Sequence, residues 1–104
     1  MTRFRCPFLK SEVELTEERE EHIRERHPDL LPKHRMSISE VLSDPDEVRA
    51  SARMTGAHLF SRRFDNIGKH VVIVVNSEAN GRHWVITAYL TRKLAQGVVE
   101  WKRS

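Results

Sequence analysis

The pattern of hydrophobic and polar residues differs between the two halves of this chain. Residues 16–29 are almost entirely polar, with Ile23 as the only aliphatic residue, whereas apolar and polar residues alternate after residue 46. In the first part, Thr16 is a favourable N-cap, and Pro28 disfavours helical geometry in the residue before it. The pattern therefore predicts a helix that begins after Thr16 and ends near His27. Because Ile23 is almost its only apolar residue, we expect this helix on the surface.

A second, shorter helix is predicted where Ser37 and Glu40 have the spacing of a capping box. The alternation after residue 46 has the period of β-strands and predicts four strands, at residues 47–53, 58–64, 70–76 and 83–91. Short turns join these strands, so they should pair antiparallel. A short early strand is expected at Val13–Leu15 and an edge strand at Val98–Trp101. The predicted class is α+β, with one or two N-terminal helices packed on a four- to five-stranded antiparallel sheet.

Length and composition limit the classes of protein that fit this pattern. The 104 residues fit a single domain spanning 1–104. The longest apolar run, Val71–Val75, is too short to cross a bilayer, and the first residues lack the apolar core of a signal peptide. We therefore expect a cytoplasmic protein without a membrane partner. The single cysteine, Cys6, excludes an internal disulfide and a thiolate zinc site. The net charge of +3 favours an anionic partner.

The end of the first helix carries the strongest chemical signal in the sequence. Two imidazoles and two guanidiniums lie within the six residues from His22 to His27. Histidine exchanges protons near neutral pH and arginine binds phosphate well, so this combination indicates chemistry on a phosphodiester. His22 shares a helix face with Arg26, whereas His22 and His27 point about 140° apart and are not a metal-binding pair. The alternative interpretation makes His22 a surface residue and His27 a helix-end residue that complements the helix dipole.

A second group of polar residues is expected on one face of the sheet, because alternate residues of a strand share a face. This predicted face carries Arg49, Ser51 and Arg53 on the first long strand and His83, Val85, Thr87, Tyr89 and Thr91 on the last one. The opposite face of the last strand, with Trp84, Ile86, Ala88 and Leu90, is expected in the core. Periodicity does not decide whether Arg62 or Arg63 joins the polar face. Threonine and tyrosine are common in strands, so a plain solvated face is the alternative.

These segments together resemble the phage-type branch of the barnase–EndoU–colicin–RelE ribonuclease superfamily. The resemblance spans Val13 to Trp101, and its most specific parts are the histidine-rich helix end before Pro28, the entry to the first long strand and the Thr-Ala-Tyr strand. In order, the matching segments are HIRERHPDL, SDPDEVRAS, LFSRRF, HVVIVVN and WVITAYLTRK. The resemblance implies a metal-independent endoribonuclease, toxin-like or phage-derived, in which the ribose 2′-hydroxyl attacks the adjacent phosphorus and leaves a 2′,3′-cyclic phosphate.

The resemblance also implies roles for individual residues. His22 or His27 would be the acid or base, with His27 preferred because a helix-end side chain can reach across a cleft. Arg49 would bind the phosphate, and Thr87 and Tyr89 would orient the scissile group. The further expected substrate contacts are Arg26, Ser51, Arg62, Arg63 and Thr91.

Two other functions fit the same residues. The basic sheet could bind RNA or a protein without cutting, as a binding module. A metal-dependent hydrolase using the histidines is disfavoured, because no pair has the spacing of a zinc motif. We therefore expect no metal and no cofactor. The expected partner is RNA, and a cognate antitoxin or immunity protein is a further candidate.

Overall fold

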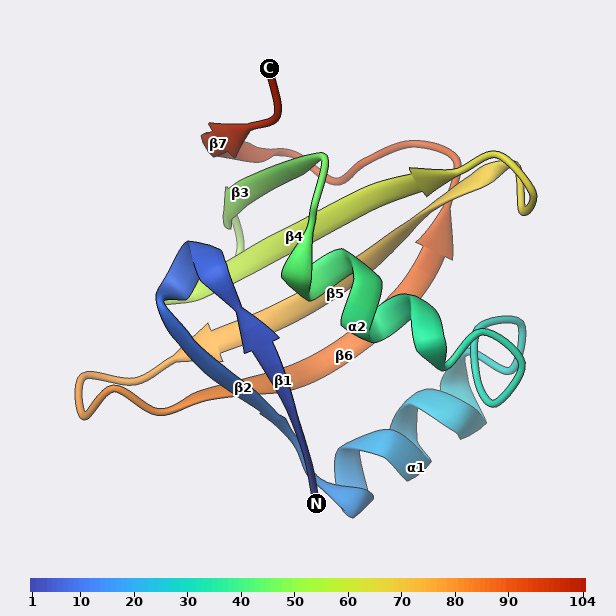
Figure 1. Cartoon of the computed structure of the whole chain (residues 1–104), viewed down its shortest axis with the longest axis horizontal. Helices are drawn as coiled ribbons and strands as arrows, with labels where there is room; N and C mark the ends of the chain where they lie inside the picture. Colours follow the sequence, from blue (N-terminus) through green and yellow to red (C-terminus); the bar gives the residue numbers. More distant parts are fainter.

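The computed structural model describes residues 1–104, in which strands predominate (Figure 1). The chain begins with a hairpin, continues through two helices and ends with five strands. The elements are β1 (Thr2–Cys6), β2 (Ser11–Leu15), α1 (Glu17–Arg26), α2 (Met36–Ser43), β3 (Glu47–Ser51), β4 (Ala57–Phe64), β5 (Lys69–Ser77), β6 (His83–Thr91) and β7 (Gly97–Lys102). None of the helices is both long and apolar enough to span a membrane.

All seven strands belong to one sheet, in the order β1-β2-β6-β5-β4-β3-β7. Strands β3 to β6 pair antiparallel in sequence order, but β2 pairs parallel to β6, with Glu14 opposite Trp84. The sheet is therefore mixed. The predicted four- to five-stranded antiparallel sheet behind N-terminal helices is wrong, because a hairpin precedes the helices and extends the sheet beyond β6.

The N-terminal hairpin explains most of this difference. In β1, Phe4 and Cys6 are buried while Arg3 and Arg5 are exposed, which is the period of a half-buried strand. This alternation covers only five residues, and pairing with β2 rather than local propensity makes it a strand. A short 3₁₀ turn and Lys10, at a left-handed φ of 53°, close the hairpin.

Both helices are close to their expected positions. Thr16 caps α1, because its hydroxyl accepts a hydrogen bond from the Arg19 N–H at 3.2 Å. The capping box at Ser37 is wrong: α2 already begins at Met36, and the Ser37 hydroxyl donates to the His34 carbonyl at 2.6 Å. The preceding turns lead directly into α2, since Arg35 has helical dihedral angles.

Helix α2 crosses one face of the sheet and α1 lies beside β6 (Figure 1). The buried residues Ile38, Val41 and Leu42 of α2 belong to the same apolar cluster as Phe60 and Ile73 of the sheet. Ile23 is the only buried residue of α1 and also belongs to this cluster. We call the sheet face opposite α2 the helix-free face.

A β-bulge in β6 decides which of its residues reach the helix-free face. Val74 pairs with Thr87 but Val75 pairs with Val85, so Ile86 is an extra residue in β6. Val85 and Ala88 therefore both lie in the core. The expected grouping of His83 and Val85 with Thr87, and of Trp84 and Ile86 with the core, is wrong because strict alternation stops at the bulge.

Because Ile23 alone anchors α1 in the core, we expect Ile23→Ala to lower the free energy of unfolding by about 2–5 kcal/mol, as for other buried aliphatic truncations. Urea unfolding of the purified chain measures this change. Glu25→Ala is the matched control, since Glu25 is exposed on the same helix, and should change stability by no more than about 0.5 kcal/mol. Equal stability of the two variants would show that α1 is not held by its apolar contact.

Candidate functional site

Cross-strand pairing brings polar residues of distant segments together on the helix-free face. Thr87 of β6 lies opposite Val74 of β5, Val74 opposite Leu59 of β4, and Leu59 opposite Arg49 of β3. A neighbouring row runs from Tyr89 through Val72 and Ser61 to Glu47. The segments around Arg49 and Thr87 are separated by more than thirty residues of sequence. The register of the meander therefore sets the geometry of this face.

The connection between β6 and β7, residues 92–96, must cross the sheet, because β5, β4 and β3 lie between these two strands. The Arg49 Nη1 donates to the Ala95 carbonyl at 2.9 Å, which places the connection on the helix-free face. The turn after β3 borders the same surface. It is shaped by the Ser51 hydroxyl, which accepts hydrogen bonds from the N–H groups of Arg53 and Met54, both at 3.2 Å. Strand β3 thus ends at Ser51, before the predicted end at Arg53.

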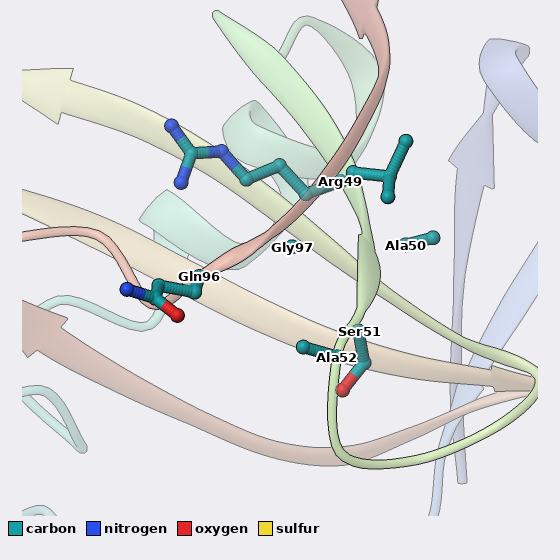
Figure 2. Close-up of a pocket in the computed structure, with 7 residues that line it drawn as sticks. Arg49, Ala50, Ser51, Ala52, Gln96 and Gly97 are labelled. Carbon is teal, nitrogen blue, oxygen red and sulfur yellow. The ribbon is translucent and has the colours of Figure 1, made fainter.

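Two hollows lie between the connection and the turn. The first, of about 540 Å³, has Leu59 and Val74 as its apolar floor and Thr87 and Tyr89 on one side. The second, of about 440 Å³, is bordered by Arg49 and by the start of β7 (Figure 2). Ser51, Ala52 and Gln96 line both hollows, so the two hollows are neighbours on this surface. We call the two hollows together the groove.

Arg49 borders the groove, but its charge is already engaged. Its Nε lies 2.6 Å from the carboxylate of Glu47, whose residue is only 9% exposed, and its Nη1 is bound to the Ala95 carbonyl. A buried carboxylate needs such a partner. Arg49 therefore holds the connection in place and has less charge available for a phosphate than the sequence predicted.

Arg53 is the cation that shares the first hollow with Tyr89. It is exposed and forms no ion pair within the protein. Burial raises the pKa of the Tyr89 hydroxyl above its ordinary value, and the positive charge of Arg53 partly opposes this rise. The hydroxyl of Thr87 is buried in the same hollow and has no hydrogen-bond partner in the protein. Buried polar groups are nearly always paired, so this unpaired hydroxyl is unusual.

His27 comes next to this surface from the end of α1. Its N–H donates to the Ile23 carbonyl at 2.7 Å, and its own carbonyl accepts from Leu30 and Leu31, so its backbone is fixed. The imidazole packs against Tyr89, with ring centroids 5.9 Å apart. Of the predicted site residues, Ser51, Thr87 and Tyr89 therefore line the first hollow and His27 contacts Tyr89, whereas Arg49 borders the second hollow, with β5 and β4 between it and Thr87.

The other predicted site residues lie elsewhere. His22 is half-buried and Arg26 exposed on α1, and neither borders the groove. Arg62 is on the opposite face, where it contacts Asp44 at 3.3 Å and covers the ring of Phe64. It faces that way because it pairs with the buried Val71.

Arg63 and Thr91 are at the far end of the helix-free face. Arg63 is exposed and lies 3.6 Å from Asp65. The Thr91 hydroxyl donates to the Lys93 carbonyl at 2.8 Å and so belongs to the local turn. Neither residue borders the groove, so the structure gives no support for their expected contact with the substrate.

Two polar groove residues, Arg53 and Gln96, were not among the predicted site residues, and neither was Glu47, which pairs with Arg49. Arg53 was placed on the polar face by its alternation with Ser51, a signal that could have identified it. Gln96 lies in a connection without periodicity, so only the tertiary structure reveals it. No group of three or more His, Cys, Asp or Glu side chains is arranged to hold a metal ion.

Tyr89 is the only tyrosine, so its ionisation can be followed directly by the ultraviolet absorbance of the phenolate. We expect a titration midpoint above the ordinary tyrosine pKa of about 10, because burial disfavours the phenolate. Arg53→Ala should raise this midpoint further, since it removes a charge that stabilises the phenolate. Arg5→Ala, an exposed substitution on β1, should leave it unchanged. Identical titration midpoints for wild type and Arg53→Ala would show that the charge of Arg53 does not act on the Tyr89 hydroxyl.

Comparisons of the chain with protein-family models, with curated proteins and with solved structures found no match. The resemblance to the ribonuclease superfamily therefore stays a prediction. Any assignment of function has to rest on the geometry of the groove and of the residues beside it.

Proposed function

We propose that the groove binds RNA and that the protein cleaves it without a metal ion, through attack of the 2′-hydroxyl on the adjacent phosphorus. The observation that carries this proposal is the contact between His27 and Tyr89 at the side of a groove that also contains Arg53 and Thr87. A proton-exchanging ring, a protonated phenol, a free cation and an unpaired hydroxyl are the groups that such a reaction uses.

Binding would begin with the phosphate. Arg53 offers a guanidinium that is not neutralised by a protein carboxylate, and planar guanidinium groups bind phosphate oxygens with two parallel hydrogen bonds. The unpaired Thr87 hydroxyl can donate to a further phosphate or ribose oxygen. Leu59 and Val74 provide an apolar floor on which a sugar or base can rest.

In the proposed reaction, His27 takes the proton of the 2′-hydroxyl, and the bond from O2′ to phosphorus forms. Tyr89 donates its proton to the leaving 5′ oxygen as the bond from phosphorus to O5′ breaks. Its raised pKa keeps it protonated at neutral pH, and an alkoxide leaving group is more basic than a phenolate. The proton on His27 then returns to Tyr89 beside it. Arg53 stabilises the charge of the phosphorane.

A binding module without cleavage is the second candidate, and the state of Arg49 favours it. Arg49 is paired with Glu47 and bound to the Ala95 carbonyl, which leaves Arg53 to stabilise the phosphorane. A single cation is enough to bind a phosphate, but it gives less of the charge stabilisation that the phosphorane transition state needs. Under either function we propose a cytoplasmic site of action, where RNA is abundant, and any cognate antitoxin or immunity protein would cover the groove.

His27 decides between the two candidates. In buffer containing EDTA, His27→Ala should lower the rate of RNA cleavage by about 10²–10⁴-fold, the usual contribution of an acid–base group. His22→Ala is the matched control and should retain activity, because His22 does not contact Tyr89. The products of the wild type should carry 2′,3′-cyclic phosphate ends. Equal rates for both variants would remove His27 from the mechanism, and RNA binding without any cleavage would favour the binding module.

Arg53 can be tested by the salt dependence of RNA binding. Arg53→Ala should weaken binding of a short single-stranded RNA and reduce the slope of log K against log salt by about 0.7, the effect of one phosphate contact. Arg62→Ala is the control, because Arg62 is on the opposite face and paired with Asp44. Equal losses of affinity in both variants would indicate diffuse attraction by the whole basic surface rather than binding in the groove.

A further inference from the structure

Trp84 is an aromatic residue of the helix-free face that the proposed chemistry does not use. The next residue, Val85, is buried in the core, and successive side chains of a strand take opposite faces, so Trp84 lies on the helix-free face. Trp84 pairs with Asn76 of β5, and Thr87 pairs with Val74, two residues earlier on the same strand. Two residues of a strand span about 7 Å, so Trp84 lies about this distance along the sheet from Thr87. Trp84 is therefore next to the groove.

Carboxylates engage both Trp84 and its neighbour Arg82. The indole Nε1–H of Trp84 donates to the Glu78 carboxylate at 3.0 Å. The Arg82 guanidinium lies over the indole, with its Cζ 5.6 Å from the ring centroid. Arg82 is also 3.1 Å from the Glu14 carboxylate and 3.5 Å from that of Glu78. Two carboxylates thus neutralise Arg82, which makes it less suited than Arg53 to bind a phosphate. We call Trp84 and Arg82 the indole–guanidinium pair.

The indole–guanidinium pair offers a flat surface rather than a free charge. Trp84 is half-buried and the Arg82 side chain is 41% exposed, so part of this surface is open to solvent. The bonds to Glu14 and Glu78 hold both planes in place before a ligand arrives, which lowers the entropy cost of stacking on them. Aromatic rings and guanidinium planes are the groups on which proteins stack the bases of single-stranded RNA.

We propose that a nucleobase stacks on the indole–guanidinium pair and that the groove accordingly takes single-stranded RNA; this inference rests on the proposed RNA-binding function. A strand whose backbone is bound at Thr87 has a neighbouring base within reach of Trp84, because the two residues lie about 7 Å apart along the sheet. In a duplex both faces of a base are covered by adjacent bases, so this pair has no base face to stack on. Every base has a π-face, so stacking selects single strands without selecting a sequence.

The test uses tryptophan fluorescence, because stacking on a base quenches the emission of an indole. The chain has two tryptophans, so Trp101→Phe leaves Trp84 as the only reporter. The probe is a short 2′-O-methyl oligouridine, which has no free 2′-hydroxyl and so resists the proposed cleavage. Its addition should lower the Trp84 emission. An oligomer of the same length and charge with abasic residues should bind through its phosphates and leave the emission unchanged, and the matching duplex should also leave it unchanged.

The affinity for the same oligouridine gives a second measurement. Trp84→Leu keeps an apolar side chain but removes the aromatic plane, and it should weaken binding about tenfold, a usual contribution of one stacked base. Its affinity for the abasic oligomer should equal that of the wild type. Trp101→Phe is the matched control and should bind as the wild type does, because Trp101 pairs with the buried Val48 and so faces the α2 side of the sheet.

The two measurements separate this inference from the function on which it rests. Lower Trp84 emission with the oligouridine alone, together with weaker binding by Trp84→Leu, supports it. Oligouridine binding that depends on Arg53 but leaves the Trp84 emission unchanged overturns the stacking site and keeps the groove as an RNA site. This result is decisive even if Trp84→Leu does not fold, since the reporter chain retains Trp84. Equal quenching by the duplex overturns the selection of single strands. Absence of oligouridine binding to the wild type overturns the proposed function and the stacking site together.

Discussion

The bulge at Ile86 is the constraint on which the candidate site depends. It lets Val85 and Ala88 both enter the core while Thr87 and Tyr89 reach the helix-free face. It also creates the docking point of α1, because the Ile86 carbonyl accepts a hydrogen bond from the Arg19 guanidinium at 3.4 Å. Beyond Trp84 the edge of β6 has no pairing with β2, so α1 can lie beside it. One extra residue thus sets both the strand face and the position of the helix that carries His27.

The pair of Glu47 and Arg49 organises the other side of the groove. Glu47 is almost fully buried, and leaving its charge without a partner would cost several kcal/mol. Arg49 supplies the partner and, with another nitrogen, fixes the connection at Ala95. Both sides of its guanidinium are therefore occupied by contacts within the protein. Arg53, two residues after the end of β3, lies in an exposed turn and makes no such contacts. Arg49 is paired because it lies within β3 beside Glu47, whereas Arg53 is unpaired because it lies in the turn that follows β3.

Local sequence patterns predicted the elements that depend on local chemistry. Thr16 caps α1, Pro28 follows its end, and the apolar alternation of the long strands produces the meander. The parallel pairing of β2 with β6 could not be predicted, because it joins segments about seventy residues apart and leaves no periodic trace. The bulge was hidden for a related reason. Its extra residue, Ile86, is β-branched like Val85 and Thr87 on either side, so the sequence has the pattern of one unbroken strand.

The same distinction applies to the candidate site. Arg49, Ser51, Thr87 and Tyr89 were placed on the same sheet face correctly, because strand period decides which face a residue takes and the bulge precedes Thr87. Period could not decide between Arg62 and Arg63, since that choice depends on the register with β5. Gln96 gave no signal, because its position depends on how the connection crosses the sheet.

The hydroxyl of Thr87 shows how stability and binding are related at this surface. An unpaired buried hydroxyl costs about 1–3 kcal/mol, a considerable part of the 5–15 kcal/mol that stabilises a typical domain. A valine there would have nearly the same shape without this cost, and the neighbouring Val74 shows that an aliphatic residue fits this row. The hydroxyl therefore has no evident benefit for the folded chain alone. Under the proposed function, a ligand oxygen or nitrogen that paired with this hydroxyl would recover that cost on binding and so add to the affinity.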